Sequence, residues 1–184
     1  KKDISGTALH HWLYPEEITK MDNKKAIKND DKTEVIIGPP ESMSKSKKNT
    51  IDPEIMIQKY GADSVRWFIL SDSPPEKDVQ WSDQGVISSS KFLQKIWDLN
   101  IQIINLKESN DTKKDELDFE VQINLFTKKI SKSIESFQFN VSIALFYEIY
   151  RVLKKALDKK ISKKILVKNM IHVMKLFIPF TPHL

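Results

Sequence analysis

The sequence predicts a mainly α-helical protein with a small irregular or β element and a loop at its N-terminal end, followed by connecting helices and an incomplete antiparallel helix bundle. Three observations predict this class. A short strand-like run, residues 33–37, lies among turn residues and ends at Gly38-Pro39-Pro40. From residue 53 onward, apolar residues recur at spacings of three and four, which is typical of amphipathic helices. A polar stretch, residues 108–115, interrupts that helical pattern.

Residues 1–38 are polar and irregular, with short apolar pieces. Residues 12–18 predict an extended segment that leads into a helical turn started by Pro15. Residues 22–24 and 29–32 are rich in Asn and Asp, which favour turns. We therefore expect a hairpin or a small β element at the edge of something larger.

Three helices are expected next, over residues 53–60, 62–70 and 82–107. Asp52 is a natural N-cap for the first, and Gly61 ends it. Pro74 and Pro75 stop the second helix. The third begins at Ser82 or Asp83, and its candidates for burial are Phe92, Ile96 and Ile103.

Three more helices follow the polar stretch 108–115, which is the expected domain boundary. The first has one apolar stripe, made of Phe119, Ile123, Phe126, Ile130, Ile134 and Phe137. Asn140 is expected to cap the second helix, which buries Ile143, Phe146, Ile149 and Leu153. The third buries Leu166, Met170, Met174 and Phe177 and stops at Pro179. The last residues run out of an apolar helix and the first is not Met, so we expect both ends to be cut and at least one bundle helix to be missing.

Composition excludes several classes of protein. With no cysteine, the chain has no disulfide framework, thiolate zinc site or thiol nucleophile. The four histidines have no partner at metal-ligand spacing, so no metal site is expected. No run approaches the roughly 20 apolar residues of a membrane helix. The net charge of +5 fits an anionic partner such as nucleic acid, although a lysine-rich genome accounts for it equally well.

The segment with the clearest chemistry is residues 42–49, Ser-Met-Ser-Lys-Ser-Lys-Lys-Asn. It lies between a Gly-Pro-Pro stop and a capped helix, so it is expected to be a loop. Its lysines and hydroxyls suit the binding of phosphate oxygens, and mobile lysines can tighten their contacts in a transition state that gathers negative charge. Composition alone favours a solvated lysine-serine loop instead.

Family resemblance favours the first interpretation. Residues 42–46 resemble the KMSKS signature of the class I aminoacyl-tRNA synthetases, with Ser42 in place of the first lysine. Residues 49–54 and 60–66 resemble the segments after that signature in the leucine, isoleucine, valine and methionine group. Similarity to the leucyl-tRNA synthetase family is found in residues 12–17, 73–78, 79–86, 137–144 and 179–183.

The resemblance implies roles for the loop residues. Lys45 is the expected catalytic residue, which contacts the ATP phosphates and stabilises the departing pyrophosphate. Met43, Ser44 and Ser46 complete the ATP-binding loop. Lys47 and Lys48 are auxiliary phosphate contacts that would compensate for the missing cation.

The resemblance also implies three domains: residues 1–52 as the end of the catalytic domain, 53–110 as connecting helices that contact the tRNA stem, and 116–184 as an anticodon-binding-type bundle. Candidate tRNA contacts are Lys128, Lys129, Lys154, Lys155, Lys159 and Lys160, with the pair at 163–164; solvated helix faces explain these lysines equally well. The tryptophans Trp67, Trp81 and Trp97 are expected in the core. Arg66 is expected to be structural and to tie its helix to the catalytic core.

The implied reaction is the ATP-dependent activation of leucine and its transfer to tRNA(Leu), with Mg²⁺ accompanying ATP. No second ATP signature of the His-Ile-Gly-His kind and no leucine pocket occur here, so leucine would bind through a missing upstream half and the isolated chain is expected to be inactive. The resemblance suggests a cytoplasmic monomer. A catalytically inert RNA-binding module derived from such a synthetase is the alternative, and a helical protein-interaction domain is a third interpretation.

Overall fold

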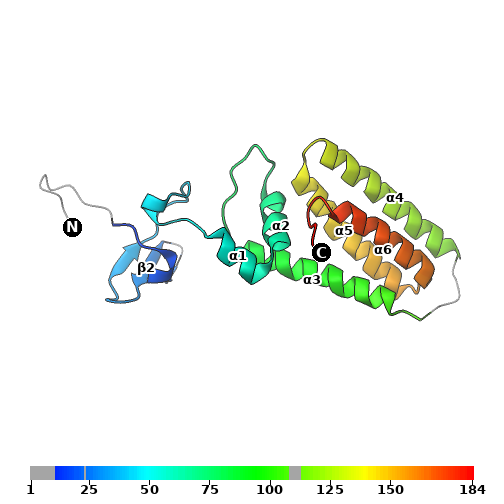
Figure 1. Cartoon of the computed structure of the whole chain (residues 1–184), viewed down its shortest axis with the longest axis horizontal. Helices are drawn as coiled ribbons and strands as arrows, with labels where there is room; N and C mark the ends of the chain where they lie inside the picture. The colour runs from blue at the N-terminus through cyan, green and yellow to red at the C-terminus, as the bar shows by residue number, and fades with distance from the viewer. Residues whose placement is uncertain (1–10, 23, 108–112) are drawn as a thin grey trace, which may run out of the picture. The chain divides into compact units, whose positions relative to one another are not determined.

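The computed structural model describes residues 11–22, 24–107 and 113–184, and divides the chain into two compact units, Lys1–Pro53 and Glu54–Leu184 (Figure 1). The first unit contains a three-stranded antiparallel sheet in the order β1-β2-β3. Its strands and short helical turns are η1 (Pro15–Glu17), β1 (Ile18–Lys20), β2 (Lys25–Lys28), β3 (Glu34–Ile36) and η2 (Lys45–Lys47). The predicted small β element and the turn started by Pro15 are confirmed.

The sheet is held by local hydrogen bonds more than by a core. In the central strand β2, Ala26 is fully buried and pairs with Val35 of β3. The carboxylate of Asp22 accepts hydrogen bonds from the backbone N–H groups of Lys24 and Lys25, at 2.7 and 2.8 Å. This is the turn chemistry expected of an Asp before a reversal of the chain. Asn23, the middle residue of that predicted turn, lies outside the described residues.

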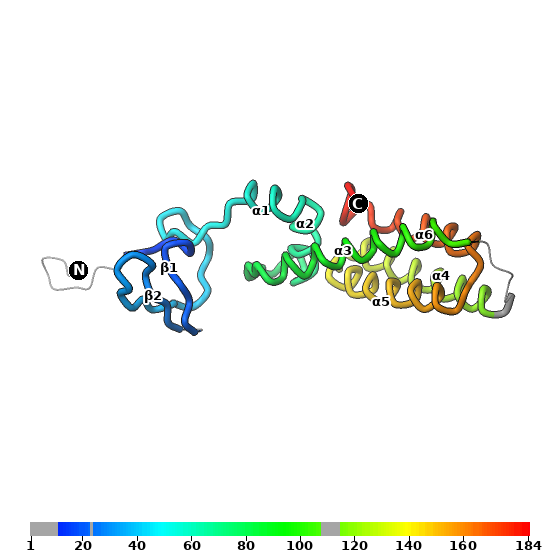
Figure 2. Tube along the Cα trace, turned by 90° about the horizontal axis from the view of Figure 1, so that it is seen from below, coloured from blue at the N-terminus to red at the C-terminus, as the bar shows by residue number. Residues whose placement is uncertain are grey.

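The second unit is helical: α1 (Pro53–Tyr60), α2 (Ala62–Asp72), α3 (Asp83–Ile104), α4 (Lys113–Glu135), α5 (Phe139–Asp158) and α6 (Lys163–Phe177). Helices α3 to α6 run alongside one another in both views (Figure 2). Ser82 is the N-cap of α3, and its side chain accepts a hydrogen bond from the Gly85 N–H at 3.1 Å. The mainly helical class is confirmed, and so are the starts of α1, α2 and α3.

Trp67 lies at the centre of the helical core. Its ring is fully buried and stacks on Phe177 of α6, with ring centroids 5.4 Å apart. Phe92 of α3 and Phe146 of α5 contact it from other sides, at 5.3 and 5.7 Å. Helices from both sides of the polar stretch 108–115 therefore share one core, while the assignment of residues 53–110 and 116–184 to different domains stays a prediction.

The end of α4 differs from the expected pattern. Phe137 lies beyond the helix, is 65% exposed, and adopts a left-handed backbone with φ of 56°. The N–H of Gln138 reaches back to the carbonyl of Ser133 at 2.8 Å, which closes the helix end in a tight reversal. Helix α5 then begins at Phe139 with Gln138 as N-cap, so Asn140 lies inside the first turn and the prediction that it caps α5 was wrong.

The tryptophans do not share one environment. Trp67 is in the core, as predicted, whereas Trp97 is 49% exposed, so the prediction of burial was wrong for Trp97. The buried face of α3 includes Ile96 and Leu99, and one residue along a helix turns the side chain by about 100°. Trp97 therefore lies at the edge of that face. Trp81 is half-buried, and its ring packs edge-on against Phe68.

Candidate functional site

The lysine-rich segment forms a loop between Gly38-Pro39-Pro40 and α1, as predicted. Within it, Ser44 precedes the single helical turn η2. Asn49 closes the loop, because its side-chain oxygen accepts from the Ser44 N–H at 2.7 Å and its side-chain amide donates to the Ser42 carbonyl at 3.3 Å. Sequence reasoning missed this role, although an Asn that bonds to nearby backbone is a common turn device.

The two serine hydroxyls of the loop lie together. The Oγ atoms of Ser44 and Ser46 are 2.7 Å apart, and either can be the donor. Because each hydroxyl has one proton and two lone pairs, the pair can turn a donor outward when an acceptor arrives. Met43, which precedes Ser44 in the sequence, is 48% exposed.

The three lysines of the loop have different surroundings. Lys47 forms an ion pair with Glu41. Lys48 adopts a left-handed backbone with φ of 52°, and its ammonium lies 4.6 Å from the centre of the Tyr14 ring. Lys45 is exposed, and its ammonium forms no ion pair or hydrogen bond with another residue in the described part of the chain. Of the three loop lysines, Lys45 is exposed, whereas Lys47 and Lys48 are half-buried.

This arrangement suits the binding of a polyphosphate. An exposed ammonium, two adjacent hydroxyls and a backbone held by Asn49 place donors of different kinds on one short segment. Charge-assisted hydrogen bonds to phosphate oxygens are the stronger class of such contacts. The acid of the loop, Glu41, forms an ion pair with Lys47, which offsets its negative charge.

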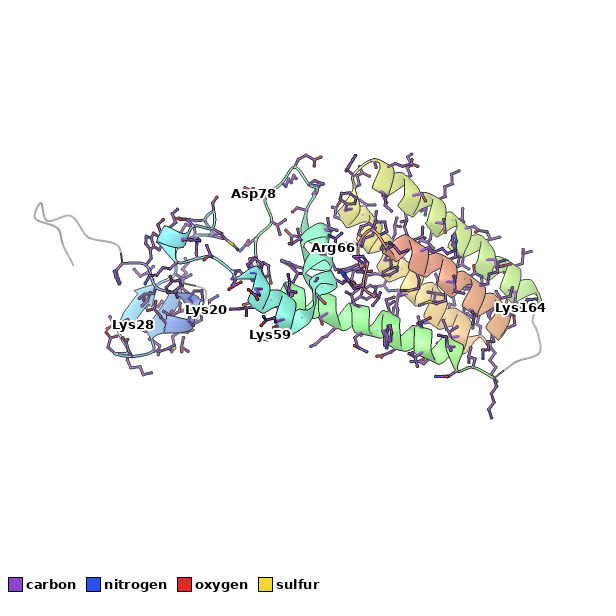
Figure 3. All side chains as sticks on the ribbon, viewed as in Figure 1. Lys20, Lys28, Lys59, Arg66, Asp78 and Lys164 are labelled. Atoms are coloured by element: carbon purple, nitrogen blue, oxygen red, sulfur yellow. The ribbon has the colours of Figure 1, made fainter. Side chains whose placement is uncertain are left out.

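The lysines predicted to contact tRNA lie on three helices and the turns between them. Lys128 and Lys129 are exposed on α4, Lys154 and Lys155 on α5, and Lys159 and Lys160 at the turn after α5. At the start of α6, Lys163 is half-buried and Lys164 is exposed (Figure 3). The structure thus places these lysines, and their contact with tRNA stays a prediction.

Acidic partners reduce the positive charge at the end of α5. The Lys159 ammonium lies 2.7 Å from Asp115 of α4, and this hydrogen bond raises the pKa of Lys159 above its ordinary value of 10.5. Lys155 and Lys159 line a small cleft of about 90 Å³ together with Asp115 and Asp118. These two lysines therefore have acids beside them, whereas Lys128 and Lys129 form no ion pair with any residue in the described part of the chain.

Arg66 connects α2 to the segment that follows α6. Its guanidinium donates to the carbonyls of Pro179 and Phe180, at 2.9 and 3.3 Å (Figure 3). A structural role was predicted, with the catalytic core as partner; these two bonds are within the helical unit, and a contact with the catalytic core stays a prediction. Backbone carbonyls more than a hundred residues away leave no local signal in the sequence.

Two other kinds of feature are absent from the described residues. No group of three or more His, Asp or Glu side chains is arranged to hold a metal ion in the part of the chain that the structure describes. His10 lies outside the described residues, and His11 is exposed. Among the described helices, none is both long enough and apolar enough to cross a membrane.

Comparison with known proteins gives the class to which this loop and its helices belong. The family model described as tRNA synthetases class I (I, L, M and V) matches residues 36–82, which include the loop, α1 and α2. Residues 36–82 thus belong to the class I tRNA synthetases.

Within that class the chain belongs with the leucine–tRNA ligases. It is 38% identical over 179 residues to the leucine–tRNA ligase of Rickettsia bellii (strain RML369-C), a match that covers 95% of this chain and 21% of that protein. The match to the enzyme of Ruegeria pomeroyi is 37% over 173 residues, covering 94% and 20%. The chain therefore spans about a fifth of the length of these relatives.

A solved structure agrees with the sequence matches. The agnB2 LeuRS of Agrobacterium radiobacter K84, crystallised as a ternary complex with tRNA and LeuAMS, superposes with a TM-score of 0.66 at 25% sequence identity. The superposition covers 77% of this chain and 19% of that protein. The resemblance inferred from residues 42–46 and their neighbours is confirmed.

Proposed function

We propose that this chain supplies the ATP-phosphate-contacting loop and tRNA-docking helices of a leucine–tRNA ligase, which activates leucine with ATP and transfers it to tRNA(Leu). The observation that supports this most is the state of Lys45, an exposed ammonium without a partner among the described residues, on a loop whose ends Asn49 holds together. A phosphate contact that strengthens as pyrophosphate leaves requires such a cation.

The remaining loop residues have supporting roles in this proposal. Ser44 and Ser46 donate to phosphate oxygens or to each other as the anion arrives and leaves. Met43 packs against the adenine side. Lys47 and Lys48 are less available than Lys45, because Glu41 and the Tyr14 ring already hold their ammonium groups. Position 42 has a serine where the family has a lysine. Lys47 or Lys48 can therefore supply the missing cation only if its contact with Glu41 or with the Tyr14 ring breaks.

Mg²⁺ enters with ATP in this proposal and is not held by the loop. The loop's carboxylate, Glu41, is paired with Lys47, and hydroxyls alone are a weak donor set for a cation that prefers charged oxygens. The phosphates of ATP supply those oxygens. Leucine binding falls to parts of the ligase that these residues do not include, and the working form is proposed to be a cytoplasmic monomer.

A catalytically inert RNA-binding module is the alternative. Such a module has a use for the helical lysines but none for an unpaired Lys45. One experiment separates the two functions. The matching fifth of the Rickettsia bellii ligase is replaced by this chain, and leucine-dependent exchange between ATP and pyrophosphate is measured in the chimera. The proposal expects exchange well above background, whereas an inert module gives none.

The Lys45→Ala variant of the chimera sharpens the test. Loss of one transition-state phosphate contact costs roughly 2–4 kcal/mol, which slows exchange by about 30- to 1000-fold. The matched control is Lys20→Ala, an exposed lysine of β1, which is expected to leave exchange unchanged. Equal effects of Lys45→Ala on exchange and on tRNA affinity would reduce Lys45 to a general electrostatic residue. The isolated chain is expected to show no exchange.

A further inference from the structure

The backbone of Lys48 is unusual for a lysine. It adopts a left-handed conformation, with φ of 52° and ψ of 30°, at the end of the turn η2. A side chain other than that of Asn or Asp rarely accompanies this conformation, because the Cβ crowds the backbone. The turn by itself therefore gives no reason for a lysine here, and an explanation has to come from the side chain.

The partner of the Lys48 ammonium is an aromatic ring. Its Nζ lies 4.6 Å from the centre of the Tyr14 ring, and it forms no ion pair or hydrogen bond with the residues that the structure describes. Tyr14 is 40% exposed, and a cation–π contact at an exposed site is weak. The backbone below the ring is fixed, because the Tyr14 N–H donates to the Glu17 carboxylate at 2.6 Å. Lys48 thus lies against a well-placed but weakly attracting surface.

The end of the loop that carries Lys48 lies against the beginning of the loop. The side-chain amide of Asn49, the next residue, donates to the Ser42 carbonyl at 3.3 Å, and its oxygen accepts from the Ser44 N–H at 2.7 Å. Lys48 therefore leaves the backbone one residue from the group that contacts Ser42, the position where the signature has its first lysine. Its flexible four-carbon stem can carry the ammonium toward that position.

Lys47 is a poorer source of the missing cation. Its ammonium is paired with the Glu41 carboxylate, so a move toward a phosphate leaves an unpaired anion in the loop that receives the phosphate. Like charges repel more strongly where solvent is partly excluded, and the two side chains of this pair are only 38% and 39% exposed. Departure of Lys48 leaves behind only the neutral Tyr14 ring. Of the two lysines, Lys48 is released at the lower cost.

We propose that Lys48 supplies the phosphate-binding cation that position 42 lacks, and that the Tyr14 ring is its resting place, which it leaves when ATP binds. The inference rests on the proposed function, in which the loop receives the phosphates of ATP. It gives two lysines different roles: Lys45 is available at once, whereas Lys48 is recruited from the ring. Tyr14 acts through Lys48 and does not itself contact ATP.

The first test measures exchange between ATP and pyrophosphate in the Rickettsia bellii chimera. Lys48→Asn removes the cation with a residue that tolerates a left-handed backbone. It is expected to lower kcat/KM for ATP about tenfold, through loss of one charge-assisted contact. In a Ser42→Lys background the same change is expected to lower it less than about twofold, because the cation is then present at position 42.

Matched variants separate the cation from the backbone. Lys32→Asn is the control, since Lys32 is an exposed lysine with φ of 59° in the turn before β3, and it is expected to leave exchange unchanged. Lys48→Arg keeps the cation and is expected to stay within about twofold of the wild type.

A second set of variants tests the ring. Tyr14→Leu removes the resting place and is expected to lower KM for ATP about two- to threefold with kcat unchanged, because the ammonium no longer leaves an aromatic face. Tyr14→Phe keeps the ring and is expected to match the wild type. In the Lys48→Asn background, Tyr14→Leu is expected to have no effect.

NMR of the 184-residue chain gives a readout that does not depend on activity. The ε-methylene protons of Lys48 are expected upfield of those of Lys32, because the ring current of Tyr14 shields them. Addition of inorganic triphosphate is expected to move them downfield, and Tyr14→Leu is expected to abolish the upfield shift. The same spectra check that each variant keeps the resonances of the folded sheet unit.

The outcomes distinguish this inference from the proposed function. Equal losses from Lys48→Asn with Ser42 and with Ser42→Lys overturn it, as do Lys48 protons that stay upfield in saturating triphosphate. An unchanged Lys48→Asn chimera in which Lys45→Ala still slows exchange overturns it while the proposed function stands. A chimera without exchange refutes the proposed function, and this inference with it.

Discussion

Asp63, in the first turn of α2, accepts two hydrogen bonds from His183, which lies 120 residues later in the chain. The backbone N–H of His183 is 2.9 Å from Oδ2 of Asp63, and the ring Nδ1 is 3.0 Å from Oδ1. A carboxylate only accepts, so the proton of the ring lies on Nδ1. One turn later, Arg66 donates to the carbonyls of Pro179 and Phe180. Together these contacts bind the start of α2 to the segment after α6.

Removal of this contact is expected to destabilise the helical unit. Asp63 is buried, with 9% of its surface exposed, so Asp63→Ala leaves the His183 N–H without its acceptor. Loss of a buried acceptor costs about 1–3 kcal/mol. His183→Ala keeps the backbone bond and is expected to cost less, about 0.5–1.5 kcal/mol. Urea unfolding of the chain measures both, with the exposed Asp78→Ala as control. A larger loss from His183→Ala than from Asp63→Ala contradicts the assignment.

Two tryptophans of the same sequence are expected to differ sharply in their contribution to stability. Trp67→Ala empties the centre of the core and is expected to lower the free energy of unfolding by about 3–5 kcal/mol. Trp97→Ala, at an exposed edge of α3, is expected to lower it by less than about 1 kcal/mol. Denaturant midpoints followed by circular dichroism give both values. Similar losses would show that α3 buries Trp97 in solution.

The loop is expected to open when Asn49 is replaced. Asn49→Ala removes the acceptor of the Ser44 N–H and the donor to the Ser42 carbonyl. Trypsin is then expected to cut after the loop lysines several times faster, because cleavage follows the population of the open form. Thr50→Ala, an exposed neighbour, is the matched control. The unfolding midpoint of the helical unit is expected to stay unchanged, which separates loop opening from global unfolding.

The ion pair between Glu120 of α4 and Lys168 of α6 predicts a pH dependence. Their charged atoms are 2.8 Å apart, and the hydrogen bond from Lys168 lowers the pKa of Glu120 below its ordinary value of 4.5. The folded state therefore favours the ionised carboxylate. Its stabilisation is present above about pH 4.5 and is lost as the pH falls through the lowered pKa.

The variant Glu120→Gln tests this dependence. At pH 7 it is expected to be less stable than the wild type by under about 1 kcal/mol, since the pair is partly solvated. The difference is expected to shrink toward zero as the pH falls below 4.5. Glu135→Gln, on the same helix and exposed, serves as the control. If the difference in unfolding free energy between Glu120→Gln and the wild type grew as the pH fell, its pH dependence would have the opposite sign. That result would refute the contribution of the ion pair.

Much of the local structure was predictable because its causes lie within a few residues. Asp52-Pro53 and Gly61 mark the ends of α1, and Ser82 marks the start of α3. The end of α4 was not predictable in the same way. The apolar spacing includes Phe137, but Phe137 itself adopts a left-handed backbone with φ of 56°, and the helix ends before it. The spacing of apolar residues does not indicate such a reversal of the chain.

Sequence by itself determined the helical class, the small β element, the loop with Lys45 and the membership among the leucine–tRNA ligases, because periodicity, caps and motif residues are local or contiguous features. The tertiary structure alone decided that Asn49 closes the loop and that Trp67 is central and Trp97 exposed. It also decided that Asp63 meets His183. Such pairings depend on how helices pack and rotate against one another, and residues 120 apart meet only after that packing is complete.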